Sequence, residues 1–124
     1  MNVLAIAIGG ALGALARYGL SVLIHRWLGT QFPYGTLAVN VLGCLVIGWV
    51  MFLAEERQIM SEPIRMFLTI GILGAFTTFS TFGFETYLLA RDGHGVLALA
   101  SIAGNLALGL GAVWVGRVLA QAAG

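Results

Sequence analysis

The sequence predicts an all-α membrane protein with four transmembrane helices in a single domain, residues 1–124. Hydrophobic residues make up 60% of the chain and charged residues 9%, against roughly 25% charged in a typical soluble domain. Four apolar stretches are long enough to span a membrane, because a hydrocarbon core of about 30 Å needs about 20 apolar helical residues. The helices are expected at about residues 2–24, 36–54, 66–89 and 96–117.

The first helix carries small and polar residues on one face. Gly9, Gly13, Arg17 and Ser21 recur every four residues, which places them on one side of a helix. Arg17 therefore points away from lipid, as the glycines do. It can act as an anion attractor or a clamp on carbonyl groups, or it can extend to the lipid headgroups. We favour an interior structural role.

The second helix repeats this pattern with Thr36, Asn40 and Gly43. Asn40 offers two N–H donors and one acceptor. It can donate to an anion in a pore, or it can form a hydrogen bond between helices that is worth roughly 0.6 kcal/mol. On composition alone, the hydrogen bond between helices is the commoner role.

The third helix contains a segment that cannot face lipid. Residues 71–82 hold two glycines, four hydroxyl groups and three phenylalanines, and an unpaired polar group in hydrocarbon costs several kcal/mol. The segment must face protein, water or an ion. We expect a helix break near Gly74, Thr77 and Thr78, with exposed carbonyl groups available to a cation. The alternative is a kink stabilised by threonine hydroxyl groups.

Two stripes run along the second half of this segment, and one of them continues to Glu85. Phe79 and Phe82 lie three residues apart on one face, and Thr78, Thr81 and Glu85 form a neighbouring stripe. An aromatic ring is positive at its edge, so rings turned edgewise can stabilise an anion without a full positive charge. Phenylalanines in a membrane helix also commonly face lipid or the protein core.

The fourth helix brings Ser101 and Asn105, four residues apart, to one face. The roles considered for Asn40 apply to both residues. The chain has 18 glycines, and small faces let membrane helices approach closely. Because four short helices enclose little interior, we expect a protein partner, most simply a second copy.

Basic residues are almost balanced between the two sides of the expected helices. Arg57, Arg65 and Arg117 share one side, Arg26 and Arg91 lie on the other, and there is no lysine. An excess of Arg and Lys on the cytoplasmic side normally sets orientation, so the sequence does not choose one. Insertion both ways round would give an antiparallel dimer with a two-fold axis in the membrane plane. The alternative is a single orientation set by other features.

Several functional classes are disfavoured. The net charge of +1 gives no reason to expect nucleic acid. No nucleotide-binding, zinc or hydrolase motif occurs, so an enzyme is not expected. Cys44 is the single cysteine, which excludes an intramolecular disulfide.

Three sequence blocks resemble the Fluc (CrcB) family of fluoride channels. They are residues 9–18, residues 35–40, and residues 71–82 followed by Glu85, and they cover three of the four helices in order. The Thr-Thr-Phe-Ser-Thr-Phe sequence is the most specific of them. The resemblance implies a dual-topology antiparallel homodimer with two fluoride pathways, placed in the inner membrane of a bacterium or archaeon.

The resemblance also implies roles for individual residues. Phe79 and Phe82 would present ring edges to fluoride, and Asn40 would donate a hydrogen bond to it. A structural sodium ion would bind the backbone carbonyls of Gly74 and Thr77 from both subunits, with no organic cofactor. Arg17 matches the structural arginine of the family. The remaining pathway residues implied are Ser80, Thr81, Glu85, Ser101 and Asn105.

The residue inventory favours passive conduction. Fluoride is small and strongly hydrated, so a selective pore must replace its water with hydrogen-bond donors. Apart from Glu85, the spans contain no obvious proton relay. A proton-coupled antiporter of the small multidrug type needs a carboxylate in mid-membrane, where the first helix has Arg17. A non-transporting scaffold subunit would explain the glycines but not the polar stripes on every helix.

Overall fold

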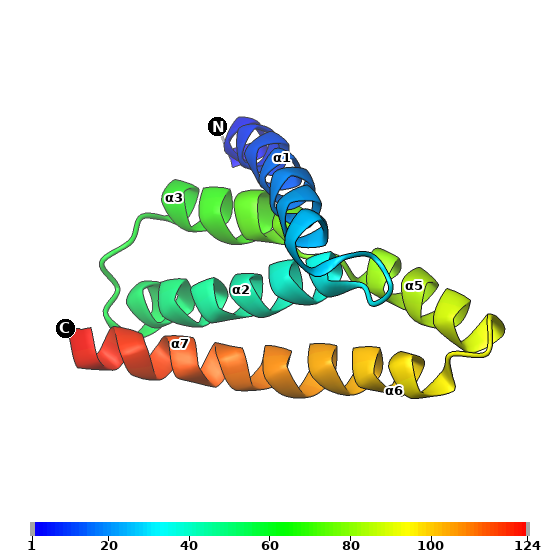
Figure 1. Cartoon of the computed structure of the whole chain (residues 1–124). Coiled ribbons are helices and arrows are strands. Elements are labelled where there is room, and N and C mark those ends of the chain that lie inside the picture. Colours follow the sequence, from blue (N-terminus) through cyan, green and yellow to red (C-terminus); the bar gives the residue numbers. More distant parts are fainter. Residues whose placement is uncertain (1, 124) are drawn as a thin grey trace.

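The computed structural model describes residues 2–123, which form only helices and short connections (Figure 1). Three of the segments, denoted η, are π-helical, with wider turns than an α-helix. The elements in chain order are α1 (Asn2–Leu28), α2 (Tyr34–Met51), η1 (Phe52–Glu56), α3 (Glu62–Met66), η2 (Phe67–Leu73), α4 (Gly74–Phe76), α5 (Phe79–Arg91), α6 (Gly95–Ala103), η3 (Gly104–Leu108) and α7 (Gly109–Ala123).

These elements join into four helices that are long and apolar enough to cross a membrane. They cover Asn2–Leu28, Tyr34–Glu56, Glu62–Arg91 and Gly95–Ala123. The expected all-α class with four spans is confirmed, and the chain is a multi-pass membrane protein. Each helix is longer than the segment expected for it, because helical backbone continues past the apolar stretch into polar residues such as His25 and Glu62.

The helices form two packed pairs (Figure 1). α2 packs along α7, and the two run in the same direction. α1 crosses η2 and α4 at a steep angle, while α3, η2 and α4 run back alongside α2. The hairpin of α5 and α6 extends beyond the other helices. Polar groups of the third span are thereby brought between α1 and α2.

Glycines make both pairings possible. A Cβ atom added to Gly13 would overlap the carbonyl oxygen of Ile72, so α1 and η2 touch through their backbones. Cβ atoms on Gly48 and Gly116 would overlap carbonyl oxygens of α7 and α2, respectively. Close backbone approach is the usual basis of helix association in lipid, where hydrophobicity supplies no driving force. These glycines therefore serve packing within one subunit.

Candidate functional site

The third span leaves helical geometry between α4 and α5. Thr77 (φ −84°, ψ 159°) and Thr78 (φ −149°, ψ 117°) both have extended backbone torsions. The amide and the hydroxyl of Thr77 each donate to the carbonyl oxygen of Leu73, at 3.1 Å. The Thr78 hydroxyl oxygen accepts from the amide of Thr81 at 3.2 Å and so caps α5. Threonine side chains satisfy backbone groups on both sides of the extended residues.

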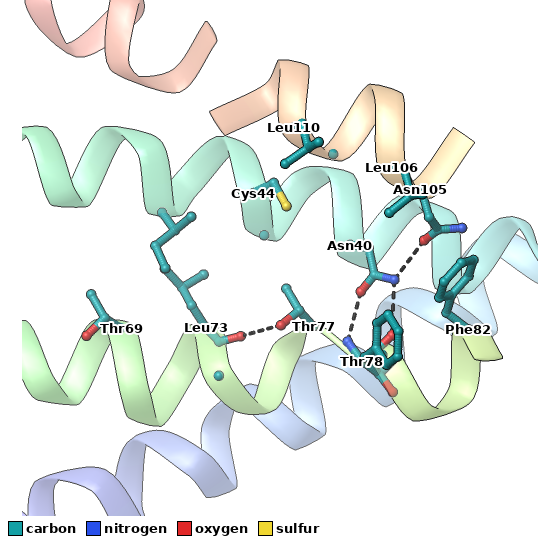
Figure 2. A pocket seen from close by; sticks show the side chains of 15 residues that line it. Asn40, Cys44, Thr69, Leu73, Thr77, Thr78, Phe82, Asn105, Leu106 and Leu110 are labelled. Carbon is teal, nitrogen blue, oxygen red and sulfur yellow. Dashed lines mark hydrogen bonds between the residues drawn. The ribbon is translucent and has the colours of Figure 1, made fainter. Parts of the chain in front are cut away.

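Asn40 of α2 holds the backbone of Thr78 from the side (Figure 2). The Asn40 Nδ2 donates to the Thr78 carbonyl at 3.1 Å, and its Oδ1 accepts from the Thr78 amide at 2.8 Å. The Asn40 Nδ2 also donates to Oδ1 of Asn105, at 2.8 Å. Asn105 in turn donates to the carbonyl of Ser101, at 2.9 Å. Asn40 therefore makes interhelical hydrogen bonds that link the second, third and fourth spans.

An apolar pocket of about 360 Å³ lies beside this network (Figure 2). Phe79 and Phe82 line it with their ring centroids 5.6 Å apart and one ring edge-on to the other. Phe82 is buried, whereas Phe79 is 79% exposed. The full lining of the apolar pocket is Asn40, Gly43, Cys44, Ile47, Thr69, Leu73, Gly74, Thr77, Thr78, Phe79, Phe82, Asn105, Leu106, Gly109 and Leu110.

A polar pocket of about 260 Å³ lies on the other side of Thr78, which lines both pockets. In it, the Thr36 hydroxyl donates to Oε1 of Glu85 at 2.5 Å. The Arg17 Nε donates to the carbonyl oxygen of Ala75 in α4 at 3.1 Å, so this arginine clamps a carbonyl of the third span. The lining of the polar pocket is Arg17, Tyr18, Ser21, His25, Thr36, Thr78, Thr81 and Glu85.

Most residues singled out from the sequence fall into one pocket or the other. Asn40, Phe79, Phe82 and Asn105 line the apolar pocket together with Gly74 and Thr77, whereas Arg17, Thr81 and Glu85 line the polar pocket. Two residues lie apart from both pockets. Ser80 is exposed on α5, and Ser101 is 1% exposed, with its hydroxyl 3.0 Å from that of Thr86.

Cys44 and His25 are pocket residues that the sequence did not single out as candidates. Cys44 lines the apolar pocket four residues after Asn40, and His25 lines the polar pocket four residues after Ser21. Each continues a polar stripe by one helical turn, so the spacing was the available signal. Among residues 2–123, no three His, Cys, Asp or Glu side chains converge as metal ligands.

Comparison with known proteins identifies the family. Residues 4–117 match the family described as "CrcB-like protein, Camphor Resistance (CrcB)". The chain belongs to the CrcB-like family. The expected resemblance is thereby confirmed over almost the whole chain, including the fourth span.

Relatives of this CrcB-like protein carry the name "Fluoride-specific ion channel FluC". The Chloroflexus aurantiacus protein is 46% identical over 115 residues, covering 93% of this chain and 91% of the relative. The Acidobacterium capsulatum protein is 46% identical over 119 residues, covering 96% and 95%. The Geobacter sulfurreducens protein is 45% identical over 120 residues, covering 97% of each. These relatives are named as channels and not as enzymes.

Proposed function

We propose that this CrcB-like protein is a fluoride-selective passive channel that exports fluoride from the cytoplasm through the inner membrane of a bacterium and so confers fluoride resistance. The observation that carries the proposal is the 46% identity, over nearly the full chain, to proteins named as fluoride-specific channels. Four membrane-length helices and two pockets that meet at Thr78 support it.

The proposed pathway runs through the apolar pocket and then the polar pocket. Phe79 and Phe82 would turn positive ring edges toward the ion, and Asn40 would donate to it by releasing its bond to Asn105. Thr81 and Glu85 would act in the polar pocket and Asn105 in the apolar pocket. Ser80 and Ser101, which lie outside both pockets, would contribute only after a rearrangement of α5 and α6. Arg17 would keep its structural bond to Ala75. A set of neutral donors suits conduction, because it replaces water without holding the ion too tightly to leave.

A second part of the proposal concerns assembly as a dual-topology antiparallel homodimer with two pores. The extended α5–α6 hairpin and the exposed ring of Phe79 support a partner at this face. The near balance of arginines supports insertion in both orientations. Reporters fused to the C-terminus should signal from both sides of the membrane, and two or three added C-terminal lysines should bias them to one side. A reporter active on one side only would contradict dual topology.

A third part concerns a structural sodium ion at the dimer centre. The backbone carbonyls of Gly74 and Thr77 from both subunits would bind it, supported by the extended torsions of Thr77 and by Gly74 and Thr77 together lining the apolar pocket. Replacing sodium by lithium or potassium should weaken dimerisation or flux. Thr77→Ser should be tolerated, whereas Gly74→Val should impair assembly by crowding a close backbone approach. Full function after prolonged sodium removal would contradict the site.

The test of the proposed function is fluoride efflux from liposomes that contain the purified chain. A passive channel should release fluoride once valinomycin lets potassium carry the balancing charge, without a proton gradient. An antiporter of the small multidrug type exchanges protons for a cationic substrate, so it should not release fluoride in this assay. A scaffold subunit would likewise give no flux above that of protein-free liposomes. Folded protein without fluoride-selective efflux would overturn the proposal.

A further inference from the structure

A third pocket continues the path beyond Glu85. This mouth pocket, of about 300 Å³, is lined by Thr30, Gln31 and Pro33 of the α1–α2 connection together with His25, Glu85, Leu88, Leu89 and Asp92. His25 and Glu85 line both the polar pocket and the mouth pocket. The apolar, polar and mouth pockets therefore follow one another along α5, and His25 and Glu85 stand at the last junction.

His25 is held at this junction by a hydrogen bond that only its neutral form can make. Its Nε2 accepts from the backbone amide of Gly35, in the first turn of α2, at 3.2 Å. A Cβ atom on Gly35 would lie 2.9 Å from the same nitrogen, so the ring rests directly on the glycine backbone. Both ring nitrogens of a protonated histidine are donors. Protonation would therefore remove the acceptor and release the ring from α2.

Charged and titratable side chains surround His25 on three parts of the chain. On its own helix these are Arg17 and Arg26, with the phenol of Tyr18; on α2 the neighbouring phenol is Tyr34; on and after α5 they are Glu85 and Asp92. The Arg91 guanidinium donates to Asp92 and lowers the pKa of that carboxyl group, so Asp92 stays ionised at neutral pH. Histidine is the side chain that ordinarily gains a proton between pH 5 and 8.

We infer that His25 is a proton-operated gate between the polar pocket and the mouth pocket. The inference rests on the proposed fluoride conduction. Neutral His25 stays bound to Gly35 at the junction. Protonated His25 leaves that amide and brings a positive charge next to Glu85, which offsets the repulsion between this carboxylate and an approaching anion. Acidification should therefore speed fluoride passage.

The experiment measures fluoride efflux at matched internal and external pH from 8.0 to 5.5, with protein-free liposomes subtracted at each pH. The rate for the parent chain should rise about threefold or more toward low pH. His25→Gln keeps a neutral acceptor for the Gly35 amide, so its rate should stay at the slow level throughout. His94→Gln is the matched control, because His94 is the second of the two histidines and is exposed before α6. It should keep the parent's pH dependence.

Nitrogen NMR of the parent, labelled at histidine, gives a readout that does not depend on flux. At pH 8 the His25 resonances should show the tautomer protonated at Nδ1, and that pattern should disappear in step with the rise in efflux. The inference is overturned if the parent's rate does not depend on pH, if His25→Gln keeps the dependence, or if the NMR transition and the flux do not coincide. Fluoride efflux at pH 8 separates the two claims, because its presence would uphold the channel even where the gate fails.

Discussion

The apolar pocket and the polar pocket share Thr78, but their linings would stabilise an anion by different interactions. In the apolar pocket the side chain of Asn40 is already hydrogen-bonded to Thr78 and Asn105. The remaining lining is mostly hydrocarbon and aromatic. The polar pocket has charged side chains, Arg17 and Glu85, each already bonded to a neutral partner.

This difference predicts that selectivity for fluoride arises in the apolar pocket. An ion that enters the apolar pocket loses most of its water, so only ring edges and a few amide hydrogens can replace that water. An ion in the polar pocket meets hydroxyl groups, the imidazole of His25 and the charged side chains of Arg17 and Glu85, an environment closer to water. Substitutions in the apolar pocket should therefore change fluoride flux much more than equally conservative substitutions in the polar pocket.

The largest effect is expected for Asn40→Asp. The change replaces a donor by a negative charge of nearly the same shape, in a site that is poor in water. Both bonds donated by Asn40 are lost, which should lower the free energy of unfolding by roughly 2 to 4 kcal/mol. Fluoride efflux should fall to the level of protein-free liposomes. A folded Asn40→Asp variant that conducts like the parent would show that the ion does not pass this residue.

A smaller loss is expected for Phe82→Ile and Phe79→Ile, or for the corresponding Met variants. These substitutions keep an apolar side chain and should cost under about 1.5 kcal/mol of stability, but they remove the ring edge. Fluoride efflux should fall about tenfold. Phe76→Ile and Phe84→Ile are matched controls, buried and exposed respectively and outside both pocket linings. Equal losses in the controls would point to packing instead of ring edges.

The smallest effect is expected in the polar pocket, for Thr36→Val. Valine keeps the shape of threonine but cannot donate to Glu85, so the stability loss should be about 1 kcal/mol. Fluoride efflux should fall by about threefold or less, because other hydroxyl groups remain. Thr36→Ser keeps the donor and should restore the rate. A Thr36→Val loss larger than that of Phe82→Ile would reverse the ranking of the two pockets.

The sequence predicted the four spans because hydropathy records which segments can lie in lipid. It also placed Asn40, Thr81 and Glu85 on inward faces, since helical periodicity shows which residues share a face. It could not tell which faces meet. The bonds from Asn40 to Thr78 and from Thr36 to Glu85 join residues 38 and 49 positions apart, and these pairs depend on how the spans pack.

Ser80 and Ser101 also show that the sequence cannot tell which partner a polar side chain will contact. Both are hydroxyl residues in polar stretches, and the family resemblance implied that they are pathway residues. The structure leaves Ser80 exposed on α5 and buries Ser101 against Thr86 of the same hairpin. A polar residue in a membrane helix must find a partner, but its sequence does not say whether that partner is an ion or another side chain.

The central claim is that fluoride passes through the apolar pocket, and Cys44 tests it most directly. Cys44 lines this pocket and is the single cysteine of the chain, so benzyl methanethiosulfonate adds a bulky group there and to no other cysteine. Fluoride efflux of the labelled parent should fall to the rate of protein-free liposomes, while Cys44→Ser treated with the reagent should keep its full rate. Complete labelling, verified by mass spectrometry, with unchanged fluoride efflux would contradict the account.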